Sequence, residues 1–181
     1  MNDPDALALL RSAIPSADGE TWADLGAGTG VFTRALASLV GTGGRVTAVD
    51  RDAHALRAIR AWAARHADGP AIDVVEADVA GPLDLPPLDG VVMANVLHFI
   101  ADAESALARI SARLKPGGRL VLVEYEGRRP SPWVPYPVSA ARFAELAAAS
   151  GLAAPRVVAA RPSAFGGEMY VAVAERIGRP G

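Results

Sequence analysis

Three glycines at alternate positions follow an acid in the segment Asp24-Leu25-Gly26-Ala27-Gly28-Thr29-Gly30. An apolar run precedes this segment and a helical pattern follows it at once. A strand, a glycine turn and a helix N-terminus in this order can hold an anionic group or a nucleotide, because backbone N–H groups come close to the ligand. Val31 stands where the dinucleotide fingerprint G-x-G-x-x-G has its third glycine, so the spacing argues against NAD or FAD.

Acids fall at the ends of three predicted strands. Asp50 closes the second strand 20 residues after Gly30, where a carboxylate can accept two hydrogen bonds from a ribose diol. Asp78 ends the third strand and can face an adenine amino group, and the Val79 N–H can bond the ring. Asp24 ends the first strand. Such acids also serve as caps and turn formers, but three of them beside a glycine turn predict one ligand crevice, and their charge favours a cationic ligand such as a sulfonium.

Hydrophobic periodicity and Gly/Pro punctuation place these residues on alternating strands and helices. Strands are predicted at Thr21–Leu25, Arg45–Asp50, Ile72–Asp78, Val91–Asn95, Arg119–Glu124, Arg156–Arg161 and Glu168–Glu175. Helices are predicted at Asp3–Ile14 with Asp3 as N-cap, and at Thr29–Val40, Asp52–His66, Asp102–Leu114 and Ser139–Ser150. Lys115–Gly118 is predicted as a turn, and the connection 162–167 as that of a final hairpin. This order predicts an α/β fold with a doubly wound, mostly parallel sheet and a final antiparallel strand.

Size and composition set further bounds. The 181 residues suit a single domain, 1–181, in which residues 1–20 form an N-terminal helix and loop. Cysteine is absent, which excludes disulfides and a cysteine nucleophile, and no His or acid cluster has metal-ligand spacing. A net charge of −2 without a basic block gives no indication of nucleic-acid binding. We see no signal peptide and no apolar run that could span a bilayer, so we expect a cytoplasmic protein without a membrane partner.

The ordered motifs resemble those of class I S-adenosylmethionine (SAM)-dependent methyltransferases, of the small-molecule type. The segments that carry this resemblance are Asp24–Gly30, Asp50, Asp78, Ala94–Phe99 and Leu114–Leu120. The resemblance implies a Rossmann-like three-layer sandwich, a seven-stranded sheet of order 3-2-1-4-5-7-6 with its last strand antiparallel, and SAM as cofactor with S-adenosylhomocysteine as product. It assigns cofactor contacts to Asp24, Gly26, Ala27, Gly28, Gly30, Asp50, Arg51, Asp78, Val79 and Asn95, with Asn95 beside the sulfonium.

Catalytic groups are needed only if the acceptor must lose a proton, because SAM is already activated and the protein chiefly aligns the reactants. His98, which follows the fourth strand, is the first candidate base; a buried histidine that caps the next helix is the alternative. Glu124 and Tyr125, at the end of the fifth strand, are the second candidates, with a strand-end surface acid as the alternative for Glu124. His54 and His66 are expected to be solvated.

The proline-rich segment after the fifth strand is the candidate acceptor site. Trp133 and Tyr136 are predicted to form an apolar lid, and Arg128 or Arg129 to hold an acidic substrate; a stiff connector is the alternative. The segment after the fourth strand, Ala94-Asn95-Val96-Leu97, lacks the pattern of amino-methylating DNA enzymes, which leaves a small-molecule acceptor. The chain is expected to be a monomer or homodimer. A NAD(P)-dependent oxidoreductase and a non-catalytic SAM-binding protein remain the alternative functions.

Overall fold

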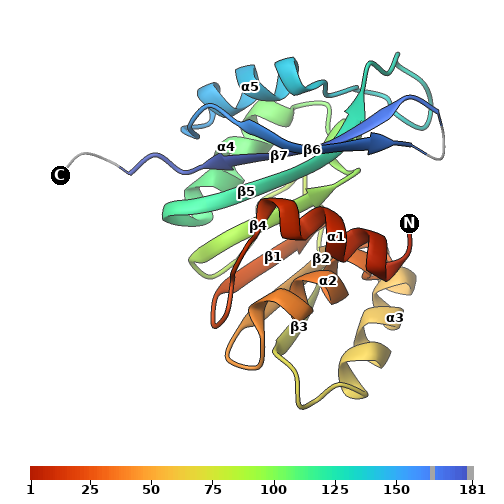
Figure 1. Ribbon diagram of the computed structural model, residues 1–181, viewed down its shortest axis with the longest axis vertical. Coiled ribbons are helices and arrows are strands. Elements are labelled where there is room, and N and C mark those ends of the chain that lie inside the picture. The colour runs from red at the N-terminus through yellow and green to blue at the C-terminus, as the bar shows by residue number, and fades with distance from the viewer. Residues whose placement is uncertain (164–165, 179–181) are drawn as a thin grey trace.

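The computed structural model describes residues 1–163 and 166–178, and within them a seven-stranded sheet has the order β3-β2-β1-β4-β5-β7-β6 (Figure 1). The strands are β1 (Thr21–Leu25), β2 (Arg45–Asp50), β3 (Ala71–Glu76), β4 (Leu88–Ala94), β5 (Leu114–Glu126), β6 (Arg156–Pro162) and β7 (Glu168–Glu175). The predicted fold class and strand order are confirmed.

Strand direction decides where the functional residues gather. β1 pairs in parallel with β2 and β4, β2 with β3, and β4 with β5, whereas β7 runs antiparallel to both β5 and β6. The carboxyl ends of β1 to β5 therefore lie at one edge of the sheet. In an open α/β sheet ligands bind at this edge, at the point where the strand order reverses. In this sheet that point lies between β1 and β4.

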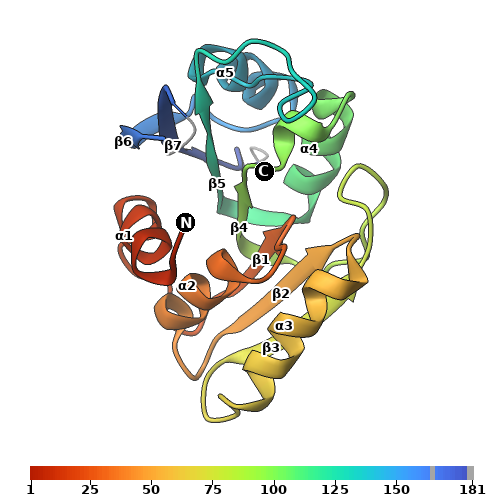
Figure 2. The ribbon, with the colours of Figure 1, turned by 90° about the vertical axis from the view of Figure 1, so that its right-hand side faces the viewer.

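Helices cover both faces of the sheet. They are α1 (Asp3–Ala13), α2 (Val31–Val40), α3 (Ala53–Ala64), α4 (Ala103–Arg113) and α5 (Ala140–Ala149), with a 3₁₀ turn η1 (Leu97–Phe99). α4 and α5 lie together on one side of the sheet, and α1, α2 and α3 on the other (Figure 2). The arrangement is the predicted three-layer sandwich.

Alternate strand residues feed two separate cores. In β5, Leu120 and Leu122 pack toward α4 and α5, whereas Val121 and Val123 pack toward α1 and α2. This is the period-2 alternation of a strand that is buried on both faces, and it explains why the central strands are continuous apolar runs.

Three local predictions are corrected by the structure. Asn2, rather than Asp3, caps α1 by accepting a hydrogen bond from the Asp5 N–H at 2.9 Å, because the helix begins one residue early and Asp3 lies in its first turn. β3 ends before Asp78, which stands two residues beyond the strand. The segment Lys115–Gly118 lies inside β5, because Leu114 already pairs with Leu88 before the register shifts at an irregularity.

The final hairpin pairs as predicted, with Pro162 opposite Glu168. Residues 164–165 of its predicted connection lie outside the described residues. Among the helices that the structure describes, none combines the length and the apolar character needed to cross a membrane.

Candidate functional site

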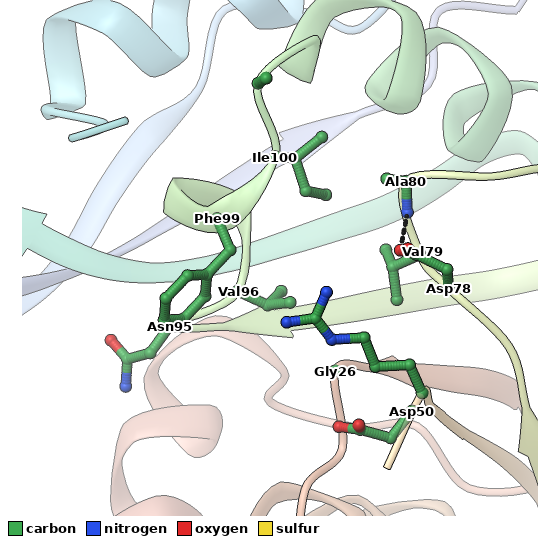
Figure 3. Close-up of a pocket in the computed structure, with 11 residues that line it drawn as sticks. Gly26, Asp50, Asp78, Val79, Ala80, Asn95, Val96, Phe99 and Ile100 are labelled. Atoms are coloured by element: carbon green, nitrogen blue, oxygen red, sulfur yellow. Dashed lines mark hydrogen bonds between the residues drawn. The ribbon is translucent and has the colours of Figure 1, made fainter. Parts of the chain in front are cut away.

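A pocket of about 310 Å³ opens at the carboxyl edge of the sheet, above β1, β2 and β4 (Figure 3). Six predicted cofactor residues line it, namely Gly26, Asp50, Arg51, Asp78, Val79 and Asn95. Sequence reasoning missed Ala80, Val96, Phe99, Ile100 and Ala101, which line it as well. Asp24, Ala27, Gly28 and Gly30 do not belong to this lining: Ala27 is buried and Gly30 is the N-cap of α2.

The glycine turn needs glycine for different reasons at two positions. Gly26 has a φ of 79°, and a Cβ there would stand 2.5 Å from Val96 Cγ2, so the turn packs directly against the chain that follows β4. Gly28 has a φ of 53°, but a Cβ there would meet no atom within 4 Å. The space beside Gly28 is therefore open to a ligand.

Asp50 ties the glycine turn to the end of β2. Its Oδ2 accepts a hydrogen bond from the Gly28 N–H at 2.7 Å, and its Oδ1 accepts from the Asp52 N–H at 2.9 Å. A carboxylate offers about four acceptor positions, so both oxygens can still accept a further hydrogen bond from a ribose hydroxyl. Asp50 thus holds the turn in place and presents acceptors to the pocket.

Asp24 lies beneath the turn and is 1% exposed. The Thr33 hydroxyl of α2 donates to its Oδ2 at 2.6 Å. Burial raises the pKa of the Asp24 carboxyl to about 7; the Thr33 hydrogen bond opposes that shift, and the negative charge of Asp50 adds to it. Asp24 is therefore positioned to set the charge under the glycine turn rather than to line the pocket.

Asp78 and Val79 form the far wall of the pocket from Asn95 (Figure 3). Asp78 Oδ1 accepts a hydrogen bond from the Ala80 N–H at 2.9 Å, which closes a local turn. Val79 is 6% exposed and belongs to the core beneath. This wall offers one carboxylate and an apolar surface, a combination that suits the edge and face of a purine ring.

Asn95 stands where the pocket meets a second cavity. Its backbone takes the left-handed φ of 55°, and its N–H donates to the Val123 carbonyl at 2.8 Å. Its side-chain Oδ1 is buried, and in the part of the chain that the structure describes it accepts no hydrogen bond. A buried acceptor without a partner is costly unless a ligand supplies a donor or positive charge. Together with Asp50 and Asp78, this atom fits a cationic cofactor such as SAM.

The second cavity, of about 860 Å³, shares Asn95 and Phe99 with the cofactor pocket. Its other walls come from η1, the end of β5 and the loop that follows, through His98, Tyr125, Arg128, Arg129, Pro130, Ser131, Trp133 and Val134. The size suits a drug-sized ligand, because such sites usually measure about 300–1,000 Å³. A cofactor pocket and an acceptor-sized cavity therefore meet at a common wall.

His98 and Glu124 form a buried pair at this cavity. His98 Nδ1 lies 2.8 Å from Glu124 Oε2, and the His98 backbone N–H donates to Glu124 Oε1 at 3.2 Å. The two residues are 2% and 1% exposed. An ionised carboxylate only accepts hydrogen bonds, so it pairs with the neutral tautomer of His98 that carries its hydrogen on Nδ1 and leaves Nε2 as an acceptor. The two candidates named separately from the sequence are thus brought together.

Of the residues predicted for the acceptor site, Trp133, Arg128 and Arg129 line the second cavity and Tyr136 does not. Trp133 lines the cavity and is 82% exposed. Tyr136 lies outside this cavity and lines a neighbouring pocket with Ile100; its backbone N–H donates to the His98 carbonyl at 2.9 Å. Arg128 lines the cavity, but its Nη2 donates to the Gly166 carbonyl at 2.7 Å and its guanidinium lies 5.0 Å from the centre of the Tyr125 ring.

The described residues also bear on the predictions for a metal site and for the two other histidines. No group of three or more His, Cys, Asp or Glu side chains is placed to hold a metal ion in residues 1–163 and 166–178. His54 and His66 lie on or just beyond α3 and are exposed.

A Rossmann-like sheet with a cofactor pocket at its carboxyl edge defines a class of nucleotide-cofactor enzymes, and the sequence comparison identifies the family. Residues 23–120 match the family described as "Methyltransferase domain", and the chain belongs to it. It is a class I SAM-dependent methyltransferase by family, and SAM, the cofactor predicted from the motifs, is the cofactor of that family.

Curated relatives share about a third of the aligned residues. The chain is 33% identical over 108 residues to the ubiquinone/menaquinone biosynthesis C-methyltransferase UbiE of Hahella chejuensis. This alignment covers 59% of this chain and 43% of that protein. The chain is 34% identical over 119 residues to the uncharacterized methyltransferase Rv0089 of Mycobacterium tuberculosis, covering 65% and 56%. The chain spans between about a third and about half of the length of the curated relatives it matches.

Solved structures share the fold over nearly the whole chain. The 1,6-didemethyltoxoflavin-N1-methyltransferase of Burkholderia thailandensis, solved with its acceptor and S-adenosylhomocysteine, matches with a TM-score of 0.75 and 25% identity, covering 97% of this chain and 78% of that one. The YcgJ protein of Bacillus subtilis matches with a TM-score of 0.79 and 12% identity, covering 97% and 99%, which shows the fold alone.

Proposed function

We propose that the protein transfers the methyl group of SAM to a hydroxyl group on a planar aromatic small molecule. In this proposal His98 is the general base and Glu124 the residue that positions it. The observation that carries the proposal is the 2.8 Å contact between His98 Nδ1 and Glu124 Oε2, at a cavity that adjoins the cofactor pocket.

SAM supplies an activated methyl group on a sulfonium when it is bound. Asp50 would accept hydrogen bonds from the ribose hydroxyls, Asp78 and Val79 would hold the adenine, and Asn95 Oδ1 would interact with the positive part of the cofactor. The glycine turn and the chain after β4 hold these groups on rigid elements. The residues would thereby align the methyl group toward the second cavity, and alignment is the larger part of what such a displacement requires.

His98 adds acid–base chemistry. Its Nε2 accepts the proton of the acceptor hydroxyl as the new oxygen–carbon bond forms and the carbon–sulfur bond breaks, which leaves a methyl ether, a neutral thioether and a protonated imidazole. Glu124 stabilises that imidazolium and fixes its tautomer from the other ring nitrogen. A well-placed general base contributes roughly 10²–10⁴-fold to a rate.

The lining of the second cavity supports an aromatic acceptor. Phe99, Tyr125 and Trp133 present three ring systems to it. Offset or edge-to-face contacts between such rings and a planar ligand are favourable beyond the area that they bury. Two of the similar proteins are named for ring systems, a ubiquinone/menaquinone biosynthesis C-methyltransferase and a 1,6-didemethyltoxoflavin-N1-methyltransferase. Their names place the methyl group on carbon and on nitrogen, so they favour a ring-containing acceptor here without favouring a hydroxyl group.

The test combines cofactor binding with an acceptor screen. Calorimetry should show binding of SAM and none of NADH, and a panel of phenols, hydroquinones and nitrogen heterocycles should reveal S-adenosylhomocysteine formation with hydroxylated rings. The variant His98→Gln should bind SAM normally and lose most of this activity. SAM binding without transfer to any acceptor would instead support a non-catalytic SAM-binding protein, and preferential NADH binding would support an oxidoreductase.

A further inference from the structure

We infer that the acceptor carries an anionic group and that Arg129 binds this group at the rim of the second cavity. This inference rests on the proposed function only in taking that cavity as the acceptor site.

The two adjoining cavities differ in charge. Among the described residues, the cofactor pocket is lined by the carboxylates of Asp50 and Asp78 and by one arginine, Arg51. The second cavity is lined by Arg128 and Arg129, and no acidic residue is among the described residues that line it. A cleft lined by one sign of charge concentrates ligands of the opposite sign. The acceptor side therefore selects an anion, whereas the cofactor side suits a cation.

Glu124, the carboxylate that pairs with His98, offers no oxygen to a ligand in the second cavity, although its charge reaches Tyr125 in the lining. Glu124 is 1% exposed and lies behind His98, with both of its oxygens accepting hydrogen bonds from that residue. It acts on His98 rather than on a ligand.

The two arginines have different freedom. Arg128 is half-buried and held, because its guanidinium donates to the Gly166 carbonyl and lies over the Tyr125 ring. Arg129 is exposed, and within the described residues no hydrogen bond or ion pair engages its guanidinium. A planar guanidinium offers paired donors that match a carboxylate or phosphate. Arg128 thus supplies a fixed positive wall, and Arg129 the donors that grip the anion.

Trp133 gives the same ligand a second contact. It sits in a turn that Ser131 and Val134 close with two backbone hydrogen bonds of 3.1 Å, flanked by prolines on the loop. Although 82% exposed, its ring borders the cavity that Arg129 lines. A stiff turn loses little entropy on binding, so it can present the indole to an aromatic ring while Arg129 holds that ring's substituent.

Matched ligands that differ only in charge test the inference directly. The first pair is 3,4-dihydroxybenzoate and 3,4-dihydroxybenzamide, and the second is 1-hydroxy-2-naphthoate and its amide; 4-hydroxyphenyl phosphate tests whether the anion is a phosphate instead. Binding is measured by calorimetry on the full chain saturated with S-adenosylhomocysteine. The control for Arg129→Gln is Arg60→Gln, which removes the same charge from the exposed face of α3, outside both cavities.

We expect the wild type to bind at least one anionic ligand about tenfold more tightly than its neutral partner, the advantage a charge-assisted guanidinium contact gives. Arg129→Gln should remove this preference, and Arg60→Gln should keep it. Added salt should weaken the binding of the anionic ligand and leave the binding of its neutral partner unchanged. Equal affinity within every pair, an unchanged preference in Arg129→Gln, or no binding by any probe overturns the inference. S-adenosylhomocysteine formation is read separately, so a charge preference without methyl transfer would leave this inference standing and defeat only the proposed function.

Discussion

His98 Nδ1 lies 2.8 Å from Glu124 Oε2, although 26 residues separate them in the sequence. The reason is the pairing of β4 with β5, in which Ala94 stands opposite Val123. Glu124 is the next residue on β5, and η1 places His98 four residues beyond Ala94. Two neighbouring parallel strands therefore deliver a carboxylate and an imidazole to the same point at their carboxyl ends.

The first prediction concerns this pair. Glu124→Gln preserves the shape of the side chain but removes the charge that stabilises a protonated His98, so kcat should fall by about 10²-fold or more while the Kd for SAM stays unchanged. The deficit should shrink at a pH where the acceptor hydroxyl ionises by itself. Steady-state kinetics across pH provide the measurement. Glu126→Gln, which changes an acid two residues along that is outside the cavity lining, is the control. Equal losses in both variants would assign Glu124 a structural role.

The second prediction concerns Asp50. Asp50→Ala removes the acceptors for the Gly28 and Asp52 N–H groups as well as those proposed for the ribose, so the Kd for SAM should rise by at least about tenfold. Asp52→Ala is the control in the same turn, because Asp52 caps α3 by accepting from the His54 and Ala55 N–H groups. It should lower the melting temperature and leave SAM affinity nearly intact. Calorimetry that finds equal affinities for Asp50→Ala and wild type would remove Asp50 from the site.

The third prediction concerns Asp24 and pH. Its pKa in the folded protein is about 7, above the ordinary value of 3.8, so the folded state holds a proton that the unfolded state releases. The stability that this group contributes is complete below about pH 3.8 and is lost as the pH rises toward 7. Asp24→Asn keeps an oxygen for the Thr33 hydroxyl but carries no charge.

Asp24→Asn should therefore exceed the wild type in unfolding free energy by only about 1 kcal/mol near pH 4.5, and by on the order of a few kcal/mol at pH 8. Denaturant titrations at both pH values measure the difference, with exposed Asp68→Asn as the control. A difference between Asp24→Asn and wild type that does not change with pH would show that Asp24 is already ionised in the folded protein at low pH.

The fourth prediction separates two glycines of the same turn. Gly26→Ala should lower the unfolding free energy by about 2–5 kcal/mol, because strain at positive φ adds to overpacking against Val96. Gly28→Ala should lower it by only about 1–2 kcal/mol, because its Cβ meets no atom. The new methyl group would nevertheless occupy the space proposed for the cofactor, so SAM affinity should fall. A folded Gly28→Ala variant that binds SAM like the wild type would place the cofactor elsewhere.

Sequence patterns predicted most of the fold because most strands here are bounded by glycines, prolines or acids that mark their ends within a few residues. The glycine turn, the acids Asp50 and Asp78 and the alternation of strands and helices fixed the sheet order once the family resemblance was included. Errors arose at boundaries, where two adjacent residues compete for one role. Asn2 and Asp3 are both good N-caps, and only the observed start of α1 distinguishes them.

The site was less predictable where it depends on contacts across the sheet. Phe99, Ile100 and Ala101 line the cofactor pocket, but apolar residues after a strand look like ordinary core. Their position directly after the strand end was the available signal. The anchoring of Arg128 was not visible either, because its partner Gly166 lies in a distant turn. Long-range contacts of this kind follow from strand pairing and cannot be derived from local spacing.

The fifth prediction concerns Asn95, which combines a left-handed backbone with a buried Oδ1 that accepts no hydrogen bond from any described residue. Asn95→Gly relieves any backbone cost and deletes the side chain, so stability should hold while the Kd for SAM rises by about threefold or more. Asn95→Ala loses the same oxygen and adds about 1–2 kcal/mol of strain, so it should lower both stability and affinity. Thermal unfolding and calorimetry on the two variants separate the backbone role from the side-chain role. If Asn95→Gly bound SAM as tightly as the wild type, the side-chain oxygen would have no part in holding the cofactor, and the conformation alone would explain asparagine at this position.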